Sequence, residues 1–227
     1  LELEGNAATY IDASANVEHA AKRCAFGAFI NSGQVCISLQ RIYVHEAIYE
    51  AFAQALVEET KALKVGSPYE EETFIGPMVN AHSVEKAQRW VKSALDEGAK
   101  LLHGFTCNDL MFAPTIMGDV QEEMTIVCEE VFAPIVSLMK VKSYEEAKEK
   151  INASAYGLQY SLFANDLSMV TDAIESFEAG GIVVNDIPTL RFDLQPYGGI
   201  KESGIGKEGP YYALLDDYTQ IKSVVIC

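Results

Sequence analysis

The sequence predicts an α/β fold, a three-layer α/β/α arrangement in which helices cover both faces of a mostly parallel sheet. Runs rich in β-branched and aromatic residues alternate with amphipathic stretches of about 10–15 residues, a pattern typical of parallel sheets. Hydrophobic residues occupy 49% of the 227 positions, which is enough for a sizeable buried core. No linker, repeat or low-complexity tract interrupts the pattern, so we expect one domain over residues 1–227.

The first part of the chain predicts two strands and two helices. Residues 7–11 form an apolar run that predicts a strand, and apolar residues recur at helical spacing over 16–29. Gly33 is placed to end that helix. The run LQRIYVH (39–45) predicts a second strand, and residues 47–64 predict a helix that ends at a Gly-Ser-Pro turn.

The remaining alternation is regular after an irregular middle. A turn-rich surface connection is expected at 68–80, and an irregular excursion around Pro114 is expected at 105–118. The other predicted elements are helices at 81–97, 143–151 and 167–177, and strands at 100–104, 134–141, 158–164 and 180–185.

The last 30 residues combine a glycine-rich loop with a terminal strand. PYGGIKESGIGKEG (196–209) predicts a tight structural loop that leads into a helix at 208–216. A phosphate cradle is not indicated, because the G-x-G-x-x-G match is missing and no strand directly precedes the glycines. About residues 217–227 predict a strand, which either pairs with a neighbouring subunit or closes an edge of its own sheet.

Charge and cysteine usage exclude several classes of function. The balance of 33 acidic against 17 basic residues gives a net charge of −16, which argues against nucleic acid or an anionic membrane surface as a partner. No apolar run approaches the roughly 20 residues of a membrane span, and no signal peptide is recognised. Five cysteines with wide spacing and four scattered histidines indicate neither a disulfide framework nor a metal site, so we expect a cytoplasmic protein.

Cys36 is the candidate nucleophile. It ends FINSGQVC (29–36), a small polar segment between two anchored elements, where a thiol is held in place yet can be reached. The alternative is an ordinary small core residue. We expect Cys36 to be the most readily alkylated cysteine, because Cys24 and Cys128 stand in apolar surroundings. His45, nine residues later, allows a Cys–His hydrolase as another hypothesis.

Two acidic motifs accompany the cysteine. Glu2 and Glu4 in LELEGN stand among apolar residues, where a carboxylate has a raised pKa and can act as a general base on water. Glu129 and Glu130 in VCEEVFAP form an acidic pair that could accept the hydroxyls of a ribose. The alternatives are a solvated charge at the first motif and an acid at a helix N-terminus at the second.

Taken together, these motifs resemble the catalytic half of the NAD(P)-dependent aldehyde dehydrogenase family. The matching segments are LELEG, FINSGQVC, EEVFAP, NASAYGL (152–158), GGIVVN and PYGGIKESGIGKEG, which follow the family's order over essentially the whole chain. FxxxGQxC together with EExFxP is highly specific. The resemblance implies the family's catalytic-domain fold and the oxidation of an aldehyde to a carboxylic acid through a thiohemiacetal and a thioester on the cysteine.

The resemblance also assigns roles to individual residues. Cys36 matches the nucleophile, whose backbone N–H forms part of the oxyanion hole. Glu2 matches the base that activates water. Glu130 and Phe132 match the residues that contact the nicotinamide ribose and position the nicotinamide ring, and Asn185 matches a structural asparagine behind the active-site loop. The substrate pocket is expected to include Val35, Ile37, Arg191 and Tyr197.

Two departures from the family pattern are visible. Glu4 stands where the family normally has a glycine that lets the backbone pass close to its neighbours. The parts that bind most of NAD or NADP, complete the oxyanion hole and receive the terminal strand lie upstream in the family. We therefore expect an excised catalytic domain of a homo-oligomeric enzyme.

Arg191 further suggests an aldehyde that carries an anionic group; the alternative is an ordinary surface salt bridge of Arg191 with Asp193 or another of the nearby acids. The alternative to an enzyme is a non-enzymatic packing or oligomerisation module.

Overall fold

The computed structural model describes residues 1–226, and Cys227 lies outside the described part. Seven strands form one sheet in the order β10-β9-β1-β2-β7-β6-β3, and every neighbouring pair is parallel except β3 and β6. The strands are β1 (Ala7–Ile11), β2 (Leu39–His45), β3 (Lys100–His103), β6 (Thr115–Gly118), β7 (Ile135–Val141), β9 (Gln159–Phe163) and β10 (Gly181–Val184). The predicted mostly parallel sheet is confirmed.

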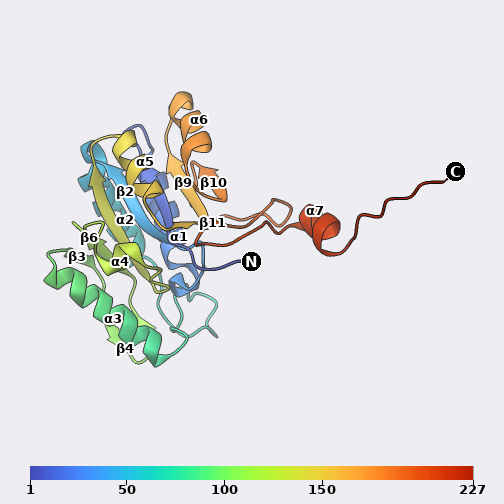
Figure 1. Cartoon of the computed structure of the whole chain (residues 1–227). Helices are drawn as coiled ribbons and strands as arrows, with labels where there is room; N and C mark the ends of the chain where they lie inside the picture. Colours follow the sequence, from blue (N-terminus) through green and yellow to red (C-terminus); the bar gives the residue numbers. More distant parts are fainter. Residues whose placement is uncertain (227) are drawn as a thin grey trace.

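Helices cover both faces of this sheet (Figure 1). Side chains alternate along the buried strands, so Ile11 and Ile42 pack on the first face while Tyr10 and Tyr43 pack on the second. The first face is covered by α1 (Val17–Phe29) and α2 (Tyr49–Lys61), and the second by α3 (Ala81–Asp96), α4 (Thr125–Cys128), α5 (Tyr144–Asn152) and α6 (Leu167–Ser176).

The excursion expected at 105–118 is more ordered than the sequence indicated. It contains a short hairpin of β4 (Cys107–Asn108) and β5 (Met111–Phe112), and then β6, which pairs with β7 inside the main sheet. The sequence signal was weak because β6 is only four residues long and directly follows Pro114. Pairing with a strand far along the chain, rather than local pattern, makes this segment a strand.

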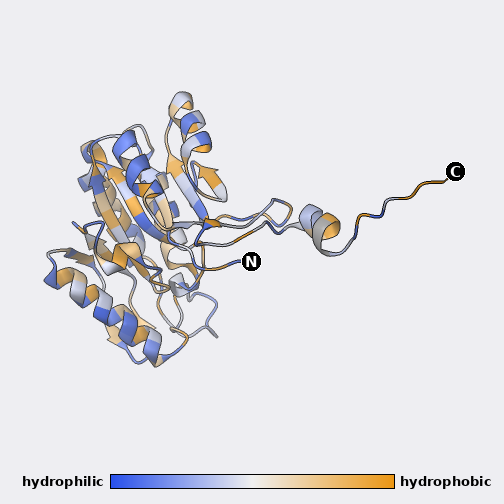
Figure 2. Ribbon diagram, viewed as in Figure 1, coloured by the Kyte–Doolittle hydropathy of each residue, from blue (hydrophilic) through white to orange (hydrophobic). Residues whose placement is uncertain are grey.

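The C-terminal part differs most from prediction. The helix expected at 208–216 is reduced to α7 (Pro210–Tyr212) and one wider turn at Ala213–Asp217. Residues 219–226 form no strand within this chain, so the strand expected near 217–227 does not close an edge of its own sheet in the described part, and its pairing with a neighbouring subunit stays a prediction. They project away from the sheet and are strongly apolar near the end (Figures 1 and 2). A strand needs a partner, and the chain offers none there.

The beginning of the chain pairs with the glycine-rich loop instead. Leu1 and Ile205 exchange backbone hydrogen bonds at 2.8 and 2.9 Å, and the Leu3 N–H donates to the Ser203 carbonyl at 3.0 Å. The same loop forms β11 (Ile200–Lys201) against β8 (Tyr156–Gly157). The glycine-rich loop therefore holds the first residues in place by backbone hydrogen bonds. Its sequence predicted a tight structural loop but not this pairing.

Candidate active site

The site lies at the edge of the sheet where β1, β2 and β7 begin. Gly5 precedes β1, Cys36 precedes β2 and Phe132 precedes β7, and the three strands are parallel neighbours. Parallel strands bring such positions to one edge. Cys36, Glu130 and Phe132 line one small cleft of about 10 Å³ together with Gly5, Gly33 and Gln40. The structure therefore brings Cys36 together with Glu130 and Phe132, which lie more than 90 positions further along the chain.

The loop that carries Cys36 is held by side-chain contacts to a second loop. Asn31 and Ser32 adopt left-handed backbone angles, with φ of 50° and 58°. Ser32 Oγ donates to the Gly76 carbonyl at 2.8 Å, and Gln34 Oε1 accepts from the Val79 N–H at 2.8 Å. These contacts offset the cost of the strained backbone and fix the path of the chain into Cys36.

Gly5, not the position of Glu4, makes the close backbone approach. A Cβ atom at Gly5 would lie 2.1 Å from the Cys36 carbonyl oxygen, so a side chain there would collide with the backbone. Glu4 is not among the residues with positive φ, and its carboxylate accepts a hydrogen bond from Tyr156 Oη at 2.9 Å. The departure from the family glycine at Glu4 is therefore accommodated without backbone strain.

Glu130 is held by the segment that precedes β1. The Gly5 N–H donates to Glu130 Oε1 at 3.0 Å. Burial raises the pKa of Glu130 to about 7; the Gly5 hydrogen bond and the Lys86 charge oppose this rise, and the Glu4 charge adds to it. The second carboxylate oxygen accepts no hydrogen bond from the residues that the structure describes. A ribose hydroxyl is a chemically suitable donor for it.

Phe132 occupies a strained position in the same turn. Its φ is 52°, which is unfavourable for a side chain of this size, and 38% of the residue is exposed. The next residue packs tightly on the nucleophile loop, because a Cβ at Gly33 would lie 2.1 Å from the Ala133 carbonyl oxygen. A half-exposed ring beside Cys36 fits one face of a flat aromatic group such as nicotinamide.

Glu2 is positioned by the glycine-rich loop. It forms an isolated antiparallel bridge with Gly204, whose φ of 145° suits glycine, and a Cβ at Gly204 would lie 2.3 Å from the Leu1 carbonyl oxygen. Glu2 lines a cavity of about 340 Å³ with Tyr197 and Glu208. Its charge contributes to the raised pKa of the Cys36 thiol.

The predicted substrate residues gather on the other side of Cys36. Val35 and Cys36 pack against a small buried cluster of Ile37, Leu158 and Tyr197. Burial, then the charges of Glu2 and Cys36, raise the pKa of the Tyr197 hydroxyl.

Arg191 contacts the cluster of Ile37, Leu158 and Tyr197 through the Tyr197 ring. Its guanidinium lies 4.1 Å from the centre of the Tyr197 ring, and Nη2 forms an exposed ion pair with Glu208 Oε1 at 2.5 Å. Arg191 and Tyr197 also line a cavity of about 240 Å³ beside β10. The partner of Arg191 is thus Glu208 rather than the nearby Asp193.

Burial raises the pKa of the Cys36 thiol, and the charges of Glu130 and Glu2 raise it further. Cys24 is buried, as its apolar surroundings predicted. Cys128 is exposed, so the expectation that it is sheltered was wrong. It ends the short helix α4, where its thiol donates to the Glu122 carbonyl at 2.9 Å. Cys36 therefore competes with an accessible second thiol for any alkylating agent.

Two other predicted residues lie away from the site. His45 ends β2, whereas Cys36 precedes that strand, so seven strand residues, roughly 20 Å, separate them. The Cys–His pair of the hydrolase hypothesis is not formed, because His45 Nδ1 accepts from the Ala47 N–H instead. Asn185 ends β10, where its Oδ1 accepts from the Ala164 N–H at 3.0 Å and tethers the start of the segment that returns toward Cys36.

The described residues contain no group of three or more His, Cys, Asp or Glu side chains that could hold a metal ion. None of their helices is long and apolar enough to cross a membrane.

Three residues of the site were missed by sequence reasoning. Gly5 was quoted only as part of a motif, although its N–H holds Glu130. Gln40 and Lys86 contact the backbone of the turn that carries Glu130, at 2.6 and 3.0 Å. A polar glutamine within a strand otherwise rich in apolar residues was the available signal for Gln40, whereas nothing local marks Lys86.

The fold and site together define an α/β domain in which a half-buried carboxylate, Glu130, and a half-exposed aromatic ring, Phe132, line one cleft with Cys36. Comparison with known proteins gives the family. The family model "Aldehyde dehydrogenase family" matches residues 1–224, and the chain belongs to this family.

Among curated relatives, the chain is 44% identical to a 3-sulfolactaldehyde dehydrogenase of Priestia aryabhattai over 226 residues, which cover 100% of this chain and 47% of that protein. It is 38% identical to a lactaldehyde dehydrogenase of Methanococcus vannielii, covering 48% of that protein. The chain thus spans about half the length of the curated relatives it matches.

Solved structures of aldehyde dehydrogenases also match this chain. Aldehyde dehydrogenase 21 from Physcomitrella patens, in complex with the reaction product succinate, matches with a TM-score of 0.90 and 40% identity over 94% of this chain and 44% of that one. The glyceraldehyde-3-phosphate dehydrogenase GapN from Methanocaldococcus jannaschii, complexed with NADP, matches with a TM-score of 0.92 and 36% identity over 95% of this chain and 47% of that one. The predicted aldehyde dehydrogenase fold is confirmed.

Proposed function

We propose that this chain supplies the catalytic half of an NAD(P)-dependent aldehyde dehydrogenase, with Cys36 as the nucleophile. The observation that carries the proposal is that Cys36 and Glu130 line one cleft, while Glu2 lines a second cavity with Tyr197, against which Cys36 packs. Membership of the aldehyde dehydrogenase family supports the reaction class.

The chemistry begins at the Cys36 sulfur. The thiolate attacks the aldehyde carbon, an S–C bond forms, and the carbonyl oxygen becomes an oxyanion that the Cys36 N–H can stabilise. NAD or NADP, when bound, would supply the acceptor for the hydride that this carbon loses. A thioester then remains on Cys36. Glu2 takes a proton from water, the water oxygen attacks the thioester carbon, and the carboxylic acid leaves as the thiolate is restored.

Glu130 and Phe132 would hold the nicotinamide end of the cofactor. Glu130 has one carboxylate oxygen fixed by the Gly5 N–H, and Phe132 offers a half-exposed ring. These two residues supply one side of the cofactor site. The chain matches only about half of its relatives' length, and the family resemblance puts most of the cofactor-binding part in the other half. We therefore expect NAD and NADP to bind this chain weakly. Calorimetry that gave micromolar affinity would contradict this expectation.

The substrate we propose is a small aldehyde that carries an anionic group. Relatives named for 3-sulfolactaldehyde, and a related structure that holds succinate, act on or bind molecules of this kind. Arg191 is the cation beside Tyr197 in this chain, and its bond to Glu208 is exposed enough to exchange for a substrate anion. Val35 and Ile37 would form the apolar wall next to the thiol.

Protection of Cys36 tests the proposed nucleophile. The chain is treated with limiting iodoacetamide, with and without a large excess of lactaldehyde, and each cysteine peptide is quantified. A reversible thiohemiacetal should protect Cys36, while labelling of Cys128 stays unchanged. A packing module predicts no protection at Cys36, and equal protection of Cys36 and Cys128 would contradict a specific site.

We further propose that the C-terminal segment joins subunits of a homo-oligomer. Tyr218 is 83% exposed, and Ile221, Val225 and Ile226 are almost fully exposed. An apolar extended segment without a partner strand is suited to pairing with another chain. Light scattering on the chain and on a version ending at residue 217 tests this, and an identical, concentration-independent mass for both would contradict it.

A further inference from the structure

The turn that carries Glu130 and Phe132 needs external support, because its backbone is strained at Phe132. Residues 129–132 join the end of α4 to β7 and belong to neither element. The Glu129 N–H donates to the Thr125 carbonyl of α4. The Glu129 and Glu130 carbonyls and the Val131 N–H instead bond to side chains from elsewhere.

Gln40 provides most of that support. Its side chain, on β2, is buried with 5% exposure. Its Nε2 donates to the Glu129 carbonyl at 2.6 Å, and its Oε1 accepts from the Val131 N–H at 3.0 Å. One amide thus contacts the backbone on both sides of Glu130, as a neighbouring strand would.

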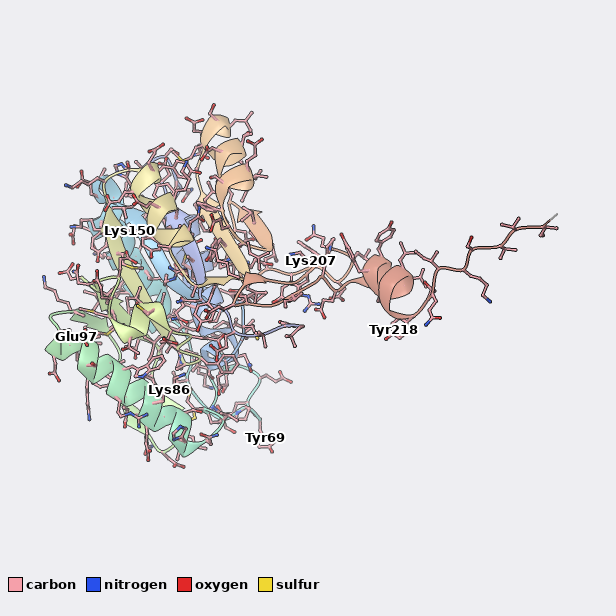
Figure 3. The ribbon with its side chains drawn as sticks, in the orientation of Figure 1. Tyr69, Lys86, Glu97, Lys150, Lys207 and Tyr218 are labelled. Carbon is pink, nitrogen blue, oxygen red and sulfur yellow. The ribbon has the colours of Figure 1, made fainter. Side chains whose placement is uncertain are left out.

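A second contact comes from the opposite side of the turn. Lys86, on α3, donates from Nζ to the Glu130 carbonyl at 3.0 Å, and its ammonium lies 4.2 Å from the centre of the Trp90 ring. Figure 3 places Lys86 on the α3 helix, at the surface of the domain. This side chain is only partly buried, so its contact with the turn is more open to water than that of Gln40.

We propose that Gln40 is a positioning residue that holds the 129–131 backbone so that the Glu130 carboxylate meets the Gly5 N–H beside Cys36. The inference rests on the proposed function for the role of Glu130. The hydrogen bonds of Gln40 do not depend on that role. Gln40 lies four residues after Cys36 and is the second residue of β2, the strand that Cys36 precedes. A shift of the nucleophile strand would therefore carry the proposed cofactor carboxylate with it, which keeps the distance between the two groups constant.

Amide hydrogen exchange in the Gln40→Met variant of the whole chain tests this proposal. Methionine matches the size of glutamine but cannot form the two hydrogen bonds. The Val131 amide loses its acceptor directly. If Gln40 positions Glu130, the Gly5 amide also loses its acceptor, although it is 125 residues from Glu130 along the chain. We expect both amides to exchange about tenfold faster or more, the equivalent of a lost hydrogen bond to a charged group.

Matched controls come from the same molecule. Gln159 on β9 is 6% exposed and pins the Pro188 and Leu190 carbonyls, so Gln159→Met removes a comparable pair of contacts from a different loop. It should leave exchange at Gly5 and Val131 unchanged. The Leu3 amide, bonded to the Ser203 carbonyl, is the internal reference and should not change in Gln40→Met.

Each outcome decides the proposal. Faster exchange at Val131 without a change at Gly5 would make Gln40 a purely local support and overturn the inference, as would no change at either amide. If Gln40→Met raises exchange throughout the chain, the experiment is repeated with Gln40→Asn. This variant keeps an amide, but its side chain is one methylene too short to reach the turn. A global rise in both variants also overturns the proposal. Failure of aldehyde to protect Cys36 would refute the proposed function without affecting these results.

Discussion

The two sides of Cys36 are built differently. On the cofactor side, the turn at 129–132 is fixed by the buried amide of Gln40 and by the Gly5 N–H. On the substrate side, Arg191 is held by an exposed ion pair and by stacking on Tyr197, while Glu2 depends on the glycine-rich loop. The cofactor side is held by well-buried groups, which resist water, whereas exposed ion pairs contribute little and can exchange partners.

This difference indicates which part of the site is fixed and which part can vary with the substrate. The Glu130 carboxylate, which we propose contacts the cofactor in every turnover, is tied to the core strand β2 through Gln40. The contact that would vary with the aldehyde is made by Arg191, an exposed charge on a loop. Substitutions on the cofactor side should therefore act on stability and on Cys36 itself, and substitutions on the substrate side should act on selectivity or on a single chemical step.

The largest effect is expected at Glu2, on the loop side. When Cys36 is acylated with an activated acetyl ester, the thioester can form without a nicotinamide, and its decay reports water attack alone. Glu2→Gln should slow this decay by about 10²–10⁴-fold, the usual contribution of a general base, because glutamine cannot take the proton. Mass spectrometry of the acylated chain measures it.

The rate of Cys36 acylation serves as the internal control in that experiment, and Glu4→Gln is the matched variant, since Glu4 bonds Tyr156 instead. Equal decay in Glu2→Gln and the parent chain would remove Glu2 from the proposed role of base.

The next effect is expected at Gly5, on the cofactor side. Gly5→Ala should lower the free energy of unfolding by about 1–3 kcal/mol, since the new Cβ would collide with the Cys36 carbonyl and the backbone must move. Chemical denaturation measures the change. Gly76→Ala is the control, because a Cβ there meets nothing within 4 Å, and it should have little effect.

Glu130 should make stability depend on pH. Its folded pKa of about 7 lies above its ordinary value of 4.5, so the folded state retains a proton that the unfolded state loses, and stability contributed by this group falls as pH rises from about 4.5 to 7. Glu130→Gln keeps an acceptor for the Gly5 N–H but carries no charge. It should raise the free energy of unfolding by about 1–3 kcal/mol at pH 8 and by nearly nothing at pH 4.

The same variant should alter Cys36. Removing the Glu130 charge lowers the pKa of the thiol, so iodoacetamide should label Cys36 faster at pH 8 in Glu130→Gln than in the parent chain. Cys128 labelling is the reference within each sample. A stability difference that does not change with pH would show that Glu130 is not buried enough to hold its proton.

The smallest effect is expected at Arg191. In a protein of net charge −16, the Arg191 guanidinium over Tyr197, against which Cys36 packs, should favour iodoacetate relative to iodoacetamide at Cys36. Arg191→Ala should lower this ratio by up to about fivefold, as expected for an exposed charge interaction of up to about 1 kcal/mol. Arg89→Ala, on the exposed face of α3, is the control. An unchanged ratio would leave Arg191 as a structural partner of Glu208.

Local sequence was sufficient for the elements of the fold that have clear periodicity. The strands at 7–11 and 39–45 and the helix at 81–96 were predicted to within a residue or two, because their side-chain patterns match the periods of strand and helix. The failures share one cause. The β6 strand needs β7 as a partner, and residues 219–226 have no partner among the described residues, so local propensity decides neither.

For the site, the sequence by itself determined which residues we propose for the chemistry, since the motifs around Cys36, Glu2 and Glu130 have characteristic residue types and order. The tertiary structure alone decided how these residues are held. Gly5 meets Cys36 and Glu130 only because β1, β2 and β7 are parallel neighbours, and Gln40 reaches the turn at 129–131 only across the sheet. Hydrogen bonds between residues 90 or more positions apart leave no periodic signal along the chain, because they depend on strand order and register rather than on neighbouring residues.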